Sequence, residues 1–264
     1  NGITIHSDVL GDFISYPFKI VENISDLHDQ DIIFICVKEY SLEEISKQLK
    51  NVINKDTILI PIMNGLNIKS KIKSWIPEAN VVESVIYIVS HMDEQYSVHQ
   101  EGSYAHIHIG TEEDNNFDLE IVRNILHDAK VDCVIEKKIK QEIWKKYIFN
   151  CAFNVVTAYY QTDVQGMRQN PQYLEEYNTL MEEAALVAKS RGVFISKGYI
   201  QRQYYYLETQ MEGNATSSLK RDIENRKRSE LETFSGELCH EARSLGIELP
   251  LTQKFYVELK QRCC

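Results

Sequence analysis

The chain changes character once, at about residue 138. Before that point, apolar runs typical of strands alternate with segments that have the spacing of helices, whereas beyond it every patterned segment is helical. Alternating strands and helices predict a parallel sheet with helical crossovers. With 264 residues the chain is long enough for two ordinary domains. We therefore expect an α/β domain over residues 1–137 and an all-helical domain over residues 138–264.

Three apolar segments carry the strand pattern. The run IIFICV at 32–37 predicts a strand buried on both faces, and TILIPIM at 57–63 predicts a second. NVVESVIYIVS at 80–90 predicts a third, and a helix with Ser41 as its N-cap is expected between the first two. This βαβαβ order predicts parallel strands.

The remaining pattern predicts one hairpin and then mostly helices. YSVHQ and AHIHIG predict two strands joined across Glu101-Gly102. A helix at 116–130 and a strand at 131–137 follow, with Gly192 and Gly246 expected as caps at the ends of later helices. Those later helices are expected at 138–160, 171–192, 198–210, 221–246 and 251–261.

Composition excludes several classes of function. The formal charge of −10, from 39 acidic against 29 basic residues, argues against nucleic-acid and anionic-membrane partners. No signal peptide or long apolar segment is evident. The cysteines lack CxxC spacing, which predicts neither a metal site nor a disulfide framework and fits a cytoplasmic protein. They are Cys36, Cys133, Cys151, Cys239, Cys263 and Cys264, of which Cys36 and Cys151 are expected in the core.

A polar stripe crosses one apolar helix of the second half. Lys146, Asn150 and Asn154 lie four residues apart in IWKKYIFNCAFNVVTAYY, so their side chains share one face. An amine and two amides on one wall suit a substrate that has a carbonyl and a carboxylate. The alternative is the solvated face of an amphipathic helix.

Two further candidates follow the first two strands. Lys38 comes after the first strand and Asn64 after the second, and ligands bind parallel sheets beyond the carboxyl ends of the strands. These side chains would suit ribose hydroxyls or a phosphate. The alternatives are a solvated lysine and an ordinary Asn-Gly turn.

The segment SSLKRDIENRKRSELE supplies the last candidates. Ser218 and Asp222 lie at the start of an expected helix, and Glu230 lies two turns further on. The alternative gives them structural roles: Ser218 as an N-cap, Asp222 as a first-turn anion and Glu230 as the partner of Arg226.

These motifs resemble, in order and spacing, those of the ketopantoate reductase (2-dehydropantoate 2-reductase) family. The resembling segments are DIIFICVKEYSLEE, NGL, IWKKYIFNCAFN, SSLKRDIENRKRSELE, Ser235-Gly236 and SLGIELP. The resemblance implies a Rossmann-type cofactor domain, partial here, followed by a helical substrate domain. It also implies NADPH as cofactor, a small 2-oxoacid as substrate, an active site in the interdomain cleft and a homodimer.

The resemblance assigns a role to each candidate. Lys146 would donate a proton to the keto oxygen, and Glu230 would hold substrate and cofactor and orient the reacting groups. Asn150, Asn154 and Ser218 would contact the substrate, Lys38 and Asn64 the nicotinamide-ribose side of NADPH, and Asp222 would support them.

One feature of the family is missing from the sequence. No G-x-G occurs, and the chain opens at NGITIHSD without a Met, so we expect an N-terminal truncation that removes the glycine loop for the pyrophosphate. The expected reaction is reduction of 2-dehydropantoate to pantoate in pantothenate and coenzyme A biosynthesis. The alternatives are reduction of another branched 2-oxoacid, and a catalytically silent fragment that acts as a binding or interaction protein.

Overall fold

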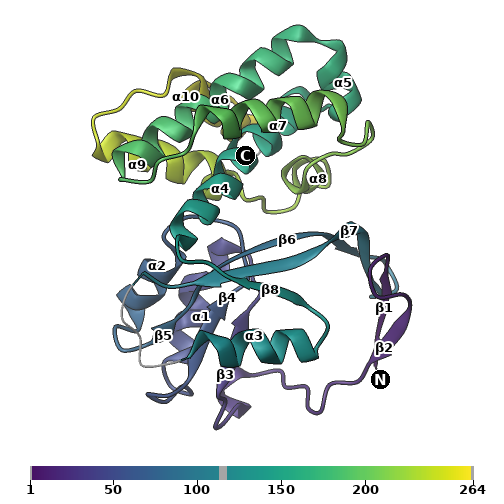
Figure 1. The fold of residues 1–264 in the computed structure, drawn as a ribbon, viewed down its shortest axis with the longest axis vertical. Helices are drawn as coiled ribbons and strands as arrows, with labels where there is room; N and C mark the ends of the chain where they lie inside the picture. The colour runs from purple at the N-terminus through teal and green to yellow at the C-terminus, as the bar shows by residue number, and fades with distance from the viewer. Residues whose placement is uncertain (1, 113–117, 263–264) are drawn as a thin grey trace. The chain divides into compact units, whose positions relative to one another are not determined.

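The computed structural model describes residues 2–112 and 118–262. Contacts divide the chain into two compact units, which are described separately below (Figure 1). The first comprises Asn1–Val37, Ser41–Met63 and Asn67–Ile139, and the second comprises Lys38–Tyr40, Asn64–Leu66 and Lys140–Cys264. Two short segments that follow strands of the first unit thus belong, by their contacts, to the second.

The first unit contains strands and helices in alternation. Its strands are β1 (Ile3–Ser7), β2 (Phe13–Ser15), β3 (Ile32–Ile35), β4 (Ile58–Pro61), β5 (Asn80–Val81), β6 (Glu83–Met92), β7 (Val98–Gly110) and β8 (Asp132–Ile135). Its helices are the 3-10 turn η1 (Ile24–Asp26), α1 (Leu42–Leu49), α2 (Ile68–Trp75) and α3 (Leu119–Asp128). The 3-10 turn η2 (Glu39–Ser41) precedes α1.

The expected parallel sheet is confirmed for β3, β4 and β5. The strands lie in that order, and both pairs are parallel, with Ile32 opposite Ile58 and Ile58 opposite Asn80. All four residues of β4 are buried, as expected for a central strand covered on both faces. Leu42 and Leu49 of α1 pack with Ile72 of α2 in the core beside this sheet.

Three local predictions for this part were wrong. The strand at 32–37 is not buried on both faces, because β3 lies at the edge of its sheet, where Phe34 is 39% exposed and Cys36 is exposed. Ser41 stands at the N-cap of α1, but its side chain makes no capping hydrogen bond because its backbone already continues the turn η2. The strand at 80–90 is divided at Val82, and its two parts join different sheets.

The predicted hairpin at 96–110 is instead one long strand. The five-stranded sheet has the order β2-β1-β7-β6 with β8 also on β7, and the hairpin runs between β6 and β7. Gly102, with φ +76°, lies within β7 where the register to β6 shifts. The Gln100 side-chain amide donates to the carbonyls of Glu101, Gly102 and Tyr104, which satisfies the irregular backbone without a turn.

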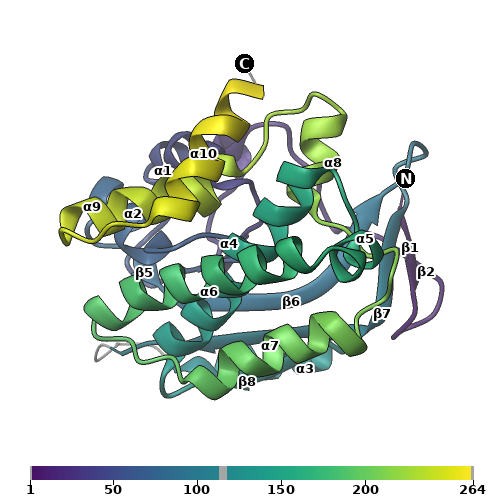
Figure 2. The same ribbon diagram turned by 90° about the horizontal axis from the view of Figure 1, so that it is seen from above.

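From residue 140 onward, all regular secondary structure in the described part of the second unit is helical. Its elements are α4 (Ile139–Tyr160), α5 (Val164–Gln169), α6 (Pro171–Ser190), α7 (Lys197–Thr209), α8 (Ser218–Glu224), the π-helix η3 (Glu232–Gly236), α9 (Glu237–Ser244) and α10 (Pro250–Arg262). Figure 2 shows α6 and α7 side by side. The core of this unit gathers around α4 and α6, with Tyr177, Phe234 and Phe255 fully buried.

The helical predictions were right for four segments and wrong for one. Gly192 and Gly246 follow helices with φ of +81° and +68°, as expected of C-terminal caps. The segment 221–246 is not one helix, because α8 ends at Glu224 and Arg226 has a left-handed backbone with φ +53°. Part of the expected helix at 116–130 lies outside the described residues, as do Cys263 and Cys264.

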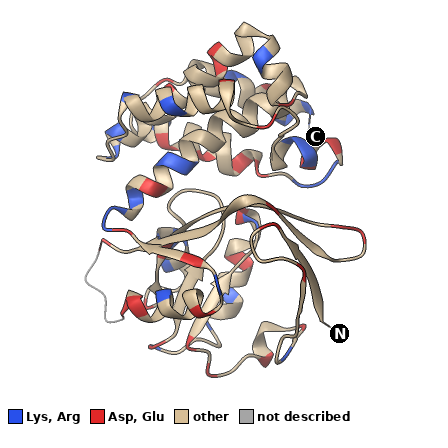
Figure 3. Ribbon diagram, turned by 45° about the vertical axis from the view of Figure 1, so that its right-hand side comes forward, with Lys and Arg blue, Asp and Glu red and all other residues tan. Residues whose placement is uncertain are grey.

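Charges of both signs are spread along each unit (Figure 3). None of the helices in the described ranges is long and apolar enough to span a bilayer.

Candidate active site

The two asparagines of α4 form a short chain of amides with Asn64. The Asn154 amide donates to Asn150 Oδ1 at 3.3 Å, and the Asn150 amide donates to Asn64 Oδ1 at 3.5 Å. Asn154 is only 6% exposed. At this residue the stripe is therefore buried, and it is not the solvated face of an amphipathic helix.

Lys146 lies one turn before Asn150 on α4, in a partly buried position. Burial lowers the pKa of its ammonium from 10.5 to about 8, and the negative charge of Glu230 opposes that change. A lysine with this pKa exchanges protons near neutral pH, which is the range that suits a general acid.

Lys38 forms ion pairs with Glu230 and Asp222, the two carboxylates that the sequence analysis named as candidates. Its Nζ lies 2.6 Å from Glu230 Oε2 and 3.4 Å from Asp222 Oδ2. The Glu230 side chain is 3% exposed, whereas that of Lys38 is 39% exposed. Burial acts to lower the pKa of Lys38, but the hydrogen bond and charge of Glu230, together with Asp222, raise it overall. Glu230 thus pairs with Lys38 and not with Arg226.

The neighbours of Lys38 tie the same short segment to the residues around Glu230. The Thr233 hydroxyl donates to Glu39 Oε2 at 3.2 Å, and the guanidinium of Arg228 lies over the Tyr40 ring at 4.0 Å. Each of the three residues 38–40 therefore makes a contact with the segment 222–233, which fixes the position of the Lys38 ammonium.

A second short segment brings Asn64 to α4. Leu66 is 2% exposed and belongs to the apolar core of the helical unit. Gly65, between Asn64 and Leu66, has φ +123°, a conformation that glycine alone adopts without strain. Leu66 and Gly65 together explain how an Asn-Gly turn holds its amide beside Asn150.

The backbone that follows Glu230 is held by two side chains of α4. Glu232–Gly236 forms the π-helix η3, in which the Glu237 N–H bonds to the carbonyl of Glu232. The buried Tyr147 hydroxyl donates to the carbonyls of Thr233 and Phe234 at 2.8 and 3.0 Å, and the Cys151 thiol lies 3.2 Å from the latter. Short π-helical segments such as η3 are frequent at functional sites.

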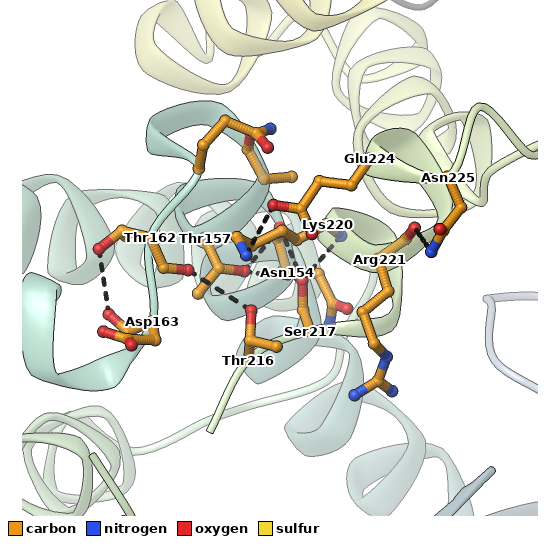
Figure 4. Close-up of polar contacts among 12 residues, drawn as sticks. Asn154, Thr157, Thr162, Asp163, Thr216, Ser217, Lys220, Arg221, Glu224 and Asn225 are labelled. Atoms are coloured by element: carbon orange, nitrogen blue, oxygen red, sulfur yellow. Dashed lines mark hydrogen bonds and ion pairs between the residues drawn. The ribbon is translucent and has the colours of Figure 1, made fainter. Parts of the chain in front are cut away.

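The start of α8 is bound to α4 by hydroxyl groups (Figure 4). The Ser217 Oγ caps α8 by accepting from the Lys220 N–H at 3.1 Å, so Ser217, and not Ser218, is the N-cap. The Thr157 Oγ1 donates to Ser217 Oγ at 2.7 Å, and both groups lie near the Asn154 carbonyl. This contact anchors the helix that carries Asp222.

The structure thus brings most of the sequence-predicted residues into two contact groups. Lys38 joins Asp222 and Glu230, whose charge acts on Lys146, and Asn64 joins Asn150 and Asn154. Within the described ranges, Ser218 makes no hydrogen bond to any of these seven residues.

Sequence reasoning missed the residues that hold these groups in place, among them Tyr147, Thr157 and Ser217. Ser217 was detectable in principle, because an N-cap directly precedes the first helical residue. Over residues 2–112 and 118–262, no three His, Cys, Asp or Glu side chains are placed to bind a metal ion.

A Rossmann-type sheet unit followed by a helical unit is the architecture of a class of two-domain oxidoreductases. The family model of the ketopantoate reductase PanE/ApbA C-terminal part matches residues 138–262, and that of ketopantoate reductase PanE/ApbA matches residues 1–114. The chain belongs to the ketopantoate reductase PanE/ApbA family.

Individual relatives are distant but cover most of the chain. A 2-dehydropantoate 2-reductase of Streptococcus pyogenes serotype M18 is 22% identical over 95% of this chain and 80% of its own length. The crystal structure of a PanE/ApbA family ketopantoate reductase from Ralstonia eutropha JMP134 matches with a TM-score of 0.89 at 20% identity, over 99% of this chain and 85% of that one.

The same fold also occurs in an enzyme with a different name. A ternary structure of D-mandelate dehydrogenase with NADH and anilino(oxo)acetate matches with a TM-score of 0.86 at 16% identity. The match covers 99% of this chain and 84% of that one.

Proposed function

We propose that the protein catalyses the NADPH-dependent reduction of 2-dehydropantoate to pantoate, a step of pantothenate and coenzyme A biosynthesis. The observation that carries this proposal is the lysine of α4, whose pKa is lowered by burial to about 8 and whose neighbours on the same face are two amides. The name of the Streptococcus pyogenes relative supports the choice of substrate.

In this proposal Lys146 acts as general acid. NADPH, when bound, would supply the hydride that reduces the keto carbon. As the carbonyl electron pair moves onto oxygen, the Lys146 ammonium stabilises the negative charge and donates its proton, so that the hydroxyl of pantoate is formed. Neutral amides at Asn150 and Asn154 bind the carboxylate and hydroxyl groups of the substrate without neutralising the ammonium.

The remaining candidates fit the nicotinamide-ribose side of the cofactor by their chemistry. Lys38 and Asn64 carry N–H donors, and Glu230 is an acceptor, which together match the hydroxyl groups of a ribose. Lys38 is partly exposed, and its segment is fixed by the contacts of Glu39 and Tyr40, so the donor is held in position. We propose a contact between Ser218 and the substrate on the family resemblance alone.

We propose residues 1–137 as the cofactor domain and residues 138–264 as the substrate domain. The two contact-defined units, which divide at Ile139 and Lys140, support this assignment. The homodimer and the cytoplasmic location that the resemblance implies are part of the same proposal.

A second candidate is the reduction of another branched 2-oxoacid. It is supported by the D-mandelate dehydrogenase, whose structure holds anilino(oxo)acetate in a related fold. The same lysine and amides would serve any 2-oxoacid, and selectivity would come from the pocket around the side chain of the substrate.

A substrate panel tests the proposal. The rate of NADPH oxidation should be measured with 2-dehydropantoate and with other branched and aromatic 2-oxoacids, and then with NADH in place of NADPH. We expect the highest kcat/KM for 2-dehydropantoate with NADPH. A higher value for another 2-oxoacid would favour the second candidate, and no turnover of any of them would favour a binding protein.

A further inference from the structure

One arginine close in sequence to the carboxylates of the candidate site lies on an aromatic ring. Arg228 is in the irregular segment between α8 and η3, two residues before Glu230. Within the described part of the chain its guanidinium forms no ion pair, and it lies over the Tyr40 ring at 4.0 Å from the centroid. Glu224, at the end of α8, is already paired with Lys220 at 2.8 Å. The contact with Tyr40 is therefore the interaction that orients the Arg228 side chain.

Tyr40 belongs to the short segment that carries Lys38. Glu39, between them, accepts a hydrogen bond from the Thr233 hydroxyl at 3.2 Å. The Lys38 side chain is 39% exposed, so its ion pair with Glu230 is partly solvated. Partly solvated ion pairs of long side chains hold their partners weakly, because ordering the side chain costs conformational entropy. The position of the ammonium therefore depends on what fixes the backbone of this segment.

We propose that Arg228 and Tyr40 form a clamp, in which the guanidinium lies on the ring and holds the backbone that presents the Lys38 ammonium. Both are positioning residues, since they act through Lys38 and need no contact with the reacting atoms. The inference deepens the proposed reductase function and rests on it, because Lys38 is there assigned to the ribose of NADPH. A clamp that orders Lys38 before the cofactor arrives reduces the entropy lost on binding and thus raises the affinity for NADPH.

The expected effect of removing the clamp is modest, because other contacts hold the same segment. A guanidinium on an exposed aromatic ring typically contributes enough to change an equilibrium about two- to fivefold. Without the clamp, the hydrogen bond between Glu39 and Thr233 and the ion pair between Lys38 and Glu230 remain. We therefore expect the segment to open locally more often, while the helical fold is retained.

The direct test measures local opening in the protein without cofactor. Hydrogen–deuterium exchange, read by mass spectrometry on peptides that cover residues 38–41, reports how often the backbone of the segment opens. In Arg228→Met and in Tyr40→Leu the exchange rate should rise about two- to fivefold over that of the wild type. The double variant should show no larger rise than either single variant, because each change removes the same contact.

Two matched variants separate the clamp from other effects of mutation. Tyr40→Phe keeps the ring face and should exchange at the wild-type rate, which distinguishes the ring contact from a role of the hydroxyl. Lys227→Met removes an exposed positive charge next to Arg228 without changing the ring contact, and it should also match the wild type. Unchanged exchange in folded Arg228→Met and Tyr40→Leu would overturn the inference, as would an equal rise in Lys227→Met.

Cofactor binding distinguishes this inference from the proposed function. If Lys38 contacts NADPH, Arg228→Met should raise the KM and the Kd for NADPH, the latter measured by its fluorescence, about two- to fivefold, with kcat at saturation within about twofold of the wild type. Faster exchange with unchanged NADPH affinity would support the clamp and contradict the assignment of Lys38 to the cofactor. An equal loss of affinity in Lys227→Met would show that charge alone acts on the anionic cofactor, and it would overturn the role of the clamp in binding.

Discussion

Replacing Lys146 by methionine should stabilise the helical unit at neutral pH. Burial lowers the pKa of this lysine from 10.5 to about 8. Each unit of pKa corresponds to 1.36 kcal/mol, so the folded state disfavours the ammonium by about 3 kcal/mol relative to the unfolded state. Loss of the attraction between Lys146 and Glu230 is already included in that value. We expect a gain of about 1–3 kcal/mol at pH 7, because the partial exposure of the side chain reduces the full amount.

The gain should depend on pH with a defined sign. Below about pH 8 the lysine is charged in both states, and the whole penalty applies to the wild type. Between pH 8 and 10.5 the folded lysine is neutral while the unfolded one still holds a proton, so wild-type stability rises with pH. The advantage of Lys146→Met should therefore shrink across this window and nearly vanish above it.

Urea unfolding at several pH values measures both effects. Trp144 lies in the core of the helical unit, so its fluorescence in a Trp75→Phe background reports the unfolding of that unit. Lys145→Met is the matched control, because Lys145 pairs with Glu142 at 2.6 Å near the surface and its loss should change stability by less than about 1 kcal/mol. A destabilised Lys146→Met, or a gain that does not vary with pH, would refute the reasoning.

Three further changes test the surroundings of the site. Tyr147→Phe removes the buried hydroxyl that donates to two carbonyls of η3, and it should lower the free energy of unfolding in urea by about 1–3 kcal/mol. An unchanged free energy of unfolding would mean that the hydroxyl does not stabilise η3. Thr157→Val keeps the shape but removes the bond to Ser217, and should lower stability by about 1 kcal/mol, whereas an unchanged midpoint would show that α8 is anchored otherwise. Burial, and to a smaller extent repulsion by His108, lowers the pKa of His106 below 6.5, so the free energy of unfolding should fall as the pH drops through 6.5. The variant His106→Gln should show a smaller fall. Equal slopes of unfolding free energy against pH in the two proteins would contradict the assignment.

The sequence predicted the elements with strong periodic patterns. The strand Ile58–Pro61 and the helix Ile139–Tyr160 were predicted correctly because their apolar patterns are compatible with few structures other than a buried strand and a core helix. The amide stripe at Asn150 and Asn154 was also predictable, since it needs only the helical period.

The remainder depends on contacts that no local pattern contains. The hairpin was predicted wrongly because Gly102 lies in a bulge whose carbonyls are bound by Gln100, and this looks like a turn in the sequence. The break after Glu224 lacks a glycine or proline and is marked only by the left-handed Arg226. The pairing of Lys38 with Glu230 joins residues 192 positions apart, so only the family resemblance suggested that they belong to one site.

The kinetics of one lysine variant test the central claim most directly. NADPH oxidation with saturating 2-dehydropantoate should be measured for the wild type, Lys146→Met and the control Lys145→Met, with fold checked by circular dichroism. If Lys146 is the general acid, kcat should fall by roughly 10²- to 10⁴-fold in Lys146→Met and stay near the wild-type value in the control. A folded Lys146→Met protein with near-normal kcat would contradict the account.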